Sequence, residues 1–414
     1  MAVIRPFRAF HPAKGMEEKI AALPYDVYNR KEACEVVRKN PLSFLAIDRA
    51  ETQFGPEVDI YAPEVYEKAA QMLREQISKG YFVQEENPCF FLYEQRMNHR
   101  SQTGIVGCAS IDDYCNNIIK KHENTREDKE MDRIRHVDVC NMQTGPIFLA
   151  YRQNQTLKDI ISRGKEKMPV FDFVSEDGIR HRGWKIAQEE EVRSISDAFH
   201  KIESIYIADG HHRCASAVKV GYKRREEHPD YTGKEEFNYF LSVLFPDEEL
   251  KILDYNRIVR DLNGLSVAEF LDKIGKKFQV TPLPGQSAFS PSHKGEFGMY
   301  LDKTWYQLTA RDEILNQDTV NGLDVSILQN ELLGPVLGIG DPKTDQRIDF
   351  VGGIRGLSEL ERRCREDGDM RVAFSMYPTS IQELFAVADE GRLMPPKSTW
   401  FEPKLRSGLF LHEI

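Results

Sequence analysis

Several signatures of common enzyme classes are missing from this chain of 414 residues. It has no G-x-x-x-x-G-K-[ST] loop, no dinucleotide-binding G-x-G-x-x-G after a strand, no kinase catalytic loop and no G-x-S-x-G turn. Any nucleotide chemistry in this protein must therefore use a different scaffold.

Long apolar runs and paired cysteines are also missing. No apolar stretch is long enough to cross a bilayer, and the first residues lack the apolar core and cleavage site of a secretory signal. The 7 cysteines are an odd number without a C-x-x-C pair, which fits neither a disulfide framework nor a structural zinc site. We therefore expect a cytoplasmic protein with reduced thiols and no membrane partner.

The chain has fewer positive than negative charges. With 56 Lys and Arg against 66 Asp and Glu, the net charge is -10, so the molecule as a whole repels a phosphate backbone. This charge argues against nucleic acid as the main partner. The sequence leaves open whether the protein forms a homo-oligomer.

Helix and strand patterns alternate along the whole chain. A Pro-started, Gly-ended helix is predicted over residues 62–80, and paired antiparallel strands over 89–97 and 102–111. The length predicts two domains, and an acidic Pro turn near residue 250 separates them into 1–250 and 251–414. The pattern as a whole predicts a mixed α/β (α+β) fold, with an α/β domain in the C-terminal part.

The most informative stretch is IYIADGHHRCASAVKVGY, residues 205–222, where an apolar strand turns directly into an alanine-rich helix. The first N-H groups of such a helix lack intrahelical partners and lie at the positive end of its dipole. Gly210 lets another group approach the backbone closely, and Arg213 supplies a fork of donors suited to phosphate. The turn therefore predicts a phosphate or carboxylate site.

Three roles are open for Asp209 in this turn. It can cap the helix, hold Mg²⁺, or take a proton from an attacking hydroxyl. The plainer alternative is a capped helix whose His211 and His212 lie in solvent or in a satisfied polar core. A metal bound by both histidines is disfavoured, because neighbouring helical residues point about 100° apart.

Other polar stretches offer partners for the turn. In IIKKHENTREDKEMDRIRH, residues 118–136, His122 and Glu123 can supply a general base, although a charge-mixed surface helix explains the pattern as well. In LPYDVYNR, Asp26 caps a helix or contributes a carboxylate. In MPPKSTWFEPKLRSGL, Lys397 and Lys404 lie in a Pro-bracketed loop that either closes over an anionic ligand or simply packs.

Several motifs taken in order resemble a prokaryotic family of uncharacterised proteins, domain of unknown function 1015. They are VIRPFRAFHP, LPYDVYNR, NPLSFLAID, KKHENT, IADGHHRCASA, YNRIVRDLNGLS and MPPKSTWFEPKLRSGL, and they run essentially end to end. The family name carries no established activity.

The stretch IYIADGHHRCASA also resembles the D-G-H-x-R box of the ParB and sulfiredoxin superfamily, which implies a ParB/sulfiredoxin-like N-terminal domain. By this resemblance His212 and Arg213 match the His-Arg pair that contacts nucleotide phosphates. His211 stands where sulfiredoxin has its nucleophilic cysteine, which removes sulfinic acid reduction as an interpretation.

Within that superfamily the box is similar to that of the archaeal ADP-dependent free serine kinase. The resemblance implies a phosphotransferase that uses ADP or ATP with Mg²⁺ and acts on free serine or a similar small hydroxyl compound. Glu123 or Asp26 would orient the acceptor, and Lys121 or Lys397 would neutralise charge. The competing hypotheses are a non-catalytic sensor of nucleotides or phospho-metabolites, a small-molecule phosphatase and, least favoured, ParB-like nucleic-acid binding.

Overall fold

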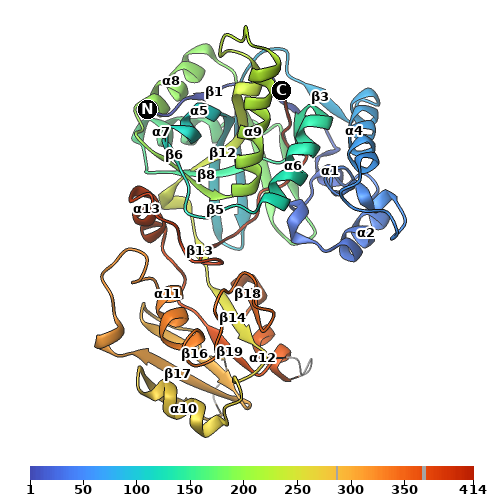
Figure 1. Cartoon of the computed structure of the whole chain (residues 1–414). Coiled ribbons are helices and arrows are strands. Elements are labelled where there is room, and N and C mark those ends of the chain that lie inside the picture. Colours follow the sequence, from blue (N-terminus) through green and yellow to red (C-terminus); the bar gives the residue numbers. More distant parts are fainter. Residues whose placement is uncertain (286–287, 366–369) are drawn as a thin grey trace. The chain divides into compact units, whose positions relative to one another are not determined.

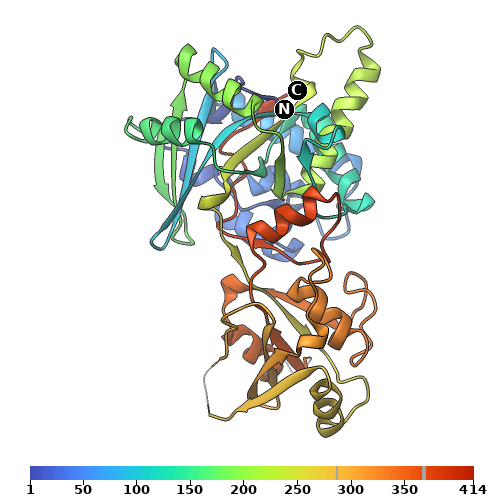
Figure 2. The ribbon, with the colours of Figure 1, turned by 90° about the vertical axis from the view of Figure 1, so that its left-hand side faces the viewer.

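The computed structural model describes residues 1–285, 288–365 and 370–414 (Figure 1). Helices and strands alternate throughout, so the predicted mixed α/β class is confirmed. Contacts divide the chain into two compact units, Met1–Leu250 with Pro403–Ile414, and Lys251–Glu402. Figure 2 gives a second view of the elements within each unit.

The last twelve residues, which the sequence analysis assigned to the C-terminal domain, belong to the first unit. The reason is that β21 (His412–Glu413) pairs antiparallel with β7 (Met142–Gln143). Leu409, Phe410 and Leu411 are completely buried there. Burial of these apolar side chains holds the C-terminal segment in the core of the first unit.

The first unit is built on a nine-stranded sheet of order β6-β11-β8-β12-β5-β4-β10-β9, with β1 beside β5. Its strands are β1 (Ile4–Arg5), β4 (Phe90–Met97), β5 (Arg100–Ser110), β6 (Ile119–Lys120), β8 (Ile147–Tyr151), β9 (Phe171–Val174), β10 (Arg180–Ile186), β11 (Ile205–Asp209) and β12 (Tyr239–Pro246). β11 is parallel to β6 and antiparallel to β8, and β8 is parallel to β12. The C-terminal ends of β6 and β11 therefore share one edge with the N-terminal ends of β8 and β12.

Helices surround this sheet and a satellite core. They are α1 (Glu17–Ile20), α2 (Arg30–Lys39), α3 (Leu45–Asp48), α4 (Pro63–Ser78), α5 (Ile111–Cys115), α6 (Glu127–Cys140), α7 (Gln155–Lys165), α8 (Glu189–His200) and α9 (His211–Glu227). A small ribbon of β2 (Phe10–Pro12) and β3 (Phe82–Gln84) completes the unit. α6 packs against both α9 and α4 (Figure 1). The stretch interpreted as a surface helix is therefore partly interior, and Glu130, Arg133 and His136 are buried.

The second unit has its own antiparallel sheet of order β15-β17-β16-β19-β14-β18. Its elements are β13 (Ile252–Leu253), β14 (Tyr255–Val259), α10 (Val267–Gly275), β15 (Phe278–Leu283), β16 (Glu296–Leu301), β17 (Thr304–Ala310), α11 (Asp324–Leu328), β18 (Ile348–Gly352), α12 (Ser358–Arg365), β19 (Val372–Ser375), α13 (Ile381–Asp389) and β20 (Trp400–Phe401). Ile258, Tyr300 and Trp305 lie in its core. α11 continues into a π-turn at Gln329–Leu333.

Every cysteine is a free thiol. Within residues 1–285, 288–365 and 370–414, no helix combines the length and the apolarity that a membrane-spanning segment needs.

Candidate phosphate-binding site

The predicted strand-to-helix turn is present. β11 ends at Asp209, Gly210 adopts the left-handed conformation with φ 91° and ψ 33°, and α9 begins at His211. A Cβ on Gly210 would lie 3.0 Å from Arg213 Nη2, because the guanidinium group folds back over this residue. Glycine is thus favoured here both by its backbone angle and by the close approach of Arg213.

Asp209 lies between two donors. Its Oδ1 accepts a hydrogen bond from the Gly210 N-H (2.8 Å), and its Oδ2 forms an ion pair with Lys404 Nζ (2.9 Å). Burial would raise the pKa of Asp209, but the positive charges of Lys404 and Arg213 outweigh it and hold this pKa well below its ordinary value. Asp209 is therefore ionised at neutral pH and is a weak proton acceptor.

Two buried histidines stand beside this carboxylate. His122 follows β6 and His211 follows β11, and the parallel pairing of these strands brings their rings together, with centroids 4.5 Å apart at 88°. Only 2% and 6% of the two residues is exposed, and His122 Nδ1 and His211 Nε2 have no hydrogen-bond partner among the described residues. Burial lowers the pKa of His122 to about 4 and that of His211 well below its ordinary value. Both rings are therefore neutral at pH 7, and their buried unpaired nitrogens require a partner such as water or a ligand.

His212 belongs to a different set of contacts. Its Nε2 accepts a hydrogen bond from the backbone N-H of Arg126 (3.0 Å). Burial lowers the pKa of His212, while the negative charges of Asp26 and Glu130 oppose that shift. Asp26 lies in the short turn Tyr25–Val27. The fold thus brings the predicted carboxylate Asp26 within electrostatic range of the predicted phosphate contact His212.

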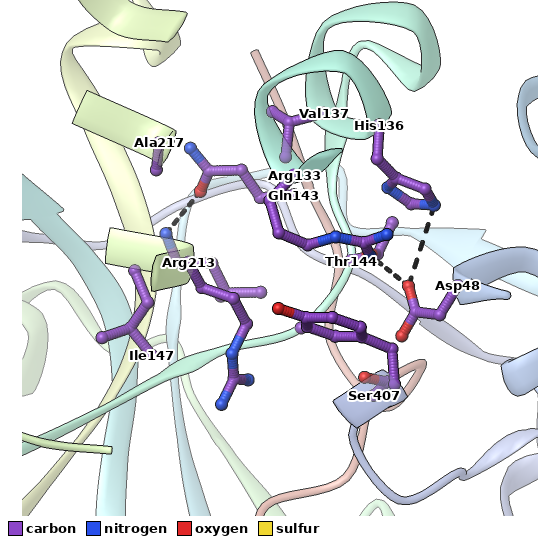
Figure 3. Close-up of a pocket in the computed structure, with 13 residues that line it drawn as sticks. Asp48, Arg133, His136, Val137, Gln143, Thr144, Ile147, Arg213, Ala217 and Ser407 are labelled. Carbon is purple, nitrogen blue, oxygen red and sulfur yellow. Dashed lines mark hydrogen bonds and ion pairs between the residues drawn. The ribbon is translucent and has the colours of Figure 1, made fainter. Parts of the chain in front are cut away.

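Arg213 lines a small pocket (Figure 3). Its Nη1 donates to the carbonyl oxygen of Pro146 (2.7 Å), just before β8. Arg133 from α6 lines the same pocket and is only 7% exposed. Its guanidinium stacks over the Tyr25 ring, 4.0 Å from the centroid, and forms an ion pair with Asp132 (2.8 Å).

Neutral polar groups and the acidic Asp48 also line this pocket. Thr144, Gln143 and Ser407 contribute to it, and Thr144 Oγ1 donates to Asp48 (2.8 Å). Figure 3 also marks the ion-pair contact of Asp48 with His136, at 3.9 Å. The two arginines and the hydroxyl and amide groups can donate to a phosphate or carboxylate, whereas the Asp48 carboxylate on the same cavity repels such an anion.

A second pocket adjoins the first and shares Tyr25 and Arg133 with it. Asp26 and Lys129 line this second pocket, together with Tyr61. Arg213 and Asp26 therefore line neighbouring pockets.

The three remaining predicted residues are Lys121, Glu123 and Lys397. Lys121 lies with its Nζ 5.3 Å from the centroid of the Tyr114 ring, and its charge acts on His211. Glu123 is half-buried in the connection between β6 and α6. Lys397 belongs to the second unit, where its Nζ is 5.6 Å from the centroid of the Tyr255 ring.

The sequence predicts no role for Tyr25 or Ser407, and it indicates Arg133 only as one of the basic residues of the stretch 118–136. Tyr25 precedes the predicted Asp26, and Ser407 lies in the same quoted stretch as Lys404, but Arg133 had no local signal beyond a charge-mixed helix. For Mg²⁺, no group of three or more His, Cys, Asp or Glu side chains in the described part of the chain could hold a metal ion. The predicted metal role of Asp209 is therefore that of a single ligand.

A scan of family models matches residues 4–326 to the family described as protein of unknown function (DUF1015). The chain belongs to this family. The membership predicted from the motifs is thereby confirmed, and the DUF1015 match includes the turn around Gly210 and both pockets' lining residues except Ser407.

Solved structures show only distant similarity to this DUF1015 member. Free serine kinase in complex with AMP is 13% identical over 72% of this chain and 86% of that chain, with a TM-score of 0.35. SbnI with C-terminal truncation from Staphylococcus aureus is 11% identical over 73% and 85%, with a TM-score of 0.37. A conserved hypothetical protein from Pyrococcus furiosus is 14% identical over 73% and 93%, with a TM-score of 0.35. No curated protein matches the chain.

Proposed function

We propose that this protein is a nucleotide-dependent phosphotransferase that binds the phosphates of ADP or ATP at the start of α9. The observation that supports this most is the position of Arg213, whose guanidinium lies over the left-handed Gly210 and lines a pocket together with the buried Arg133. A helix N-terminus, two arginines and the unpaired Nε2 of buried His211 together provide donors for a phosphate.

The proposed acceptor is free serine or another small hydroxyl compound placed in the second pocket near Asp26. In the transfer step the acceptor oxygen bonds to the terminal phosphorus, and the bond from that phosphorus to the nucleotide's bridging oxygen breaks. The hydroxyl proton passes to a carboxylate, for which we favour Asp26 over Glu123 because Asp26 lines the pocket next to Arg133. Catalysis would rest on positioning, on charge stabilisation by Arg213 and Arg133, and on a hydrogen bond from the neutral His212 ring.

Mg²⁺ is compatible with this arrangement. This ion usually takes one or two carboxylates together with substrate phosphates, and Asp209 can be one such ligand, although Gly210 and Lys404 already donate to its oxygens. When bound, the ion would neutralise phosphate charge.

Binding is tested first, by calorimetric titration of ADP, ATP and inorganic phosphate into the full chain. A ligand at 100 times its Kd adds about 2.7 kcal/mol of stability, so thermal shift provides a second reading. Arg213→Ala should weaken nucleotide binding about 10-fold to 100-fold, because a charge-assisted hydrogen bond contributes about 1.5–3 kcal/mol. Arg193→Ala, on the exposed face of α8, is the matched control and should change nothing. Unchanged affinity in Arg213→Ala, or no binding to wild type, would contradict the proposal.

A second candidate is a non-catalytic sensor of a nucleotide or phospho-metabolite. The low pKa values of Asp209 and His122 favour it, because both groups are weak proton acceptors at neutral pH. Turnover separates the candidates. A kinase or a phosphatase converts serine or O-phosphoserine in a ³¹P NMR assay, and Asp26→Asn should remove that conversion while leaving the ADP Kd nearly unchanged. A sensor binds without any conversion.

A further inference from the structure

The C-terminal segment Pro403–Ile414 places a lysine at the phosphate turn. Lys404 and Asp209 are 195 residues apart in the sequence, yet Lys404 Nζ lies 2.9 Å from Asp209 Oδ2. Only 16% of the Lys404 side chain is exposed, so this pair differs from the many exposed lysine pairs on the surface. An ion pair that excludes solvent on one partner is less screened than an exposed pair.

The backbone of Lys404 is fixed as firmly as its ammonium. Its carbonyl oxygen accepts a hydrogen bond from Gln95 Nε2 (2.8 Å), and Gln95 Oε1 accepts one from Gln102 Nε2 (3.1 Å). Gln95 is fully buried in β4. Arg406, two residues further on, is buried and paired with Asp177. The backbone is therefore held at Lys404 and again at Arg406.

A cation is needed at this position if the turn binds a phosphate. Asp209 carries a full negative charge next to the start of α9, and this charge repels an anion that approaches the same N-H groups. Lys404 neutralises the carboxylate. An ammonium group has three N-H donors, so it can hold a carboxylate oxygen and a phosphate oxygen at the same time.

We propose that Lys404 is a phosphate-binding residue of this site, supplied by the C-terminal segment and oriented by Asp209. The inference rests on the proposed function and gives to Lys404 the charge-neutralising role that the sequence suggested for Lys121 or Lys397. The 12-residue segment is then a part of the binding site as well as a part of the core.

The test is calorimetric titration of ADP without Mg²⁺ into the full chain and its variants, at low and moderate salt. Lys404→Met should raise the Kd about 10-fold at low salt, with a smaller effect as salt increases, whereas Lys404→Arg should stay within about 3-fold of wild type. Lys185→Met is the matched control. It also removes a lysine from an ion pair, with Glu85, but on β10, which four strands separate from β11.

Asp209→Asn distinguishes ligand binding from a merely structural pair. If Lys404 only holds Asp209 in place, removing either partner disrupts the same contact, and both variants weaken ADP binding. If Lys404 binds phosphate, Asp209→Asn keeps the lysine and removes a repelling charge, so the Mg²⁺-free Kd of ADP should fall or stay equal. The expected result is therefore a raised Kd in Lys404→Met together with an equal or lower Kd in Asp209→Asn.

Three outcomes would overturn the inference. The first is a folded Lys404→Met, with an unchanged circular dichroism spectrum, that binds ADP like wild type. The second is an Asp209→Asn that loses affinity as Lys404→Met does, which also decides the matter if Lys404→Met fails to fold. In both cases a loss of binding in Arg213→Ala leaves the proposed function standing. If wild type binds neither ADP nor phosphate, the proposed function and this inference fall together.

Discussion

Two helices, one in each unit, begin in opposite ways. α13 starts with a capping box, in which Ser380 Oγ accepts a hydrogen bond from the Glu383 N-H and Glu383 accepts one from the Ser380 N-H. α9 starts after Gly210, and among the described residues no side chain caps it. Both helices follow a buried strand, β19 and β11, so the difference lies in the turn alone.

The start of α13 stabilises its own helix, whereas the start of α9 leaves its N-H donors available. A capping box satisfies N-H groups at the first turn, whereas the carboxylate beside α9 accepts from Gly210 and Lys404 and leaves that turn uncapped. Because uncapped N-H groups and the helix dipole attract anions, the α9 turn is the better ligand site.

The largest expected effect concerns a third helix start, where α11 begins with Asp324. Burial raises the pKa of Asp324 to about 7, although the Gly295 N-H donates to both of its oxygens (3.0 and 3.1 Å). Between about pH 4 and pH 7 the unfolded chain binds fewer protons at this group than the folded chain does, so stability falls as pH rises. The loss is at most about 4 kcal/mol, since each unit of pKa difference corresponds to about 1.4 kcal/mol.

Hydrogen exchange of amides in the second unit between pH 5 and pH 8, corrected for the intrinsic exchange rate, measures this slope. Asp324→Asn should flatten it, because the variant no longer titrates. The pH dependence of stability that Asp209 contributes has the opposite sign. Because its pKa is lowered in the folded chain, the stability that it contributes is lost only in acid, as pH falls below about 4. An Asp324→Asn variant that keeps the wild-type slope would show that another group titrates.

The next prediction compares two glycines with positive φ. Gly210→Ala and Gly391→Ala should each cost about 1–2 kcal/mol of unfolding free energy, because a left-handed conformation is unfavourable for alanine. Only Gly210→Ala should also weaken ADP binding, since its Cβ would press on the Arg213 guanidinium, whereas nothing lies within 4 Å of a Cβ at Gly391. Urea unfolding and calorimetric titration give the two readings. Equal ADP affinity in both variants would remove the special role of the α9 turn.

Local sequence patterns were sufficient to predict the turn at the start of α9, but they were not sufficient to predict the residues around it. Asp209, Gly210 and Arg213 form a strand-to-helix turn whose chemistry is encoded in five consecutive residues. Arg133 looked like part of a solvated helix, because a charge-mixed pattern does not reveal that α6 packs against both α9 and α4. The contact of Lys404 with Asp209 depends on the C-terminal segment returning to the first unit, which no local pattern encodes.

The smallest expected effect concerns the capping box that stabilises the start of α13. Ser380→Ala removes the capping box of α13 and should cost about 1 kcal/mol of unfolding free energy in the second unit. Ser266→Ala, which removes the equivalent box of α10, should cost a similar amount and serves as the matched control. Neither variant should change the Kd of ADP, because the two caps act on the starts of α13 and α10 and not on the start of α9. If Ser380→Ala alone altered ADP affinity, the start of α13 would belong to a binding site as well, and an uncapped turn would no longer distinguish α9.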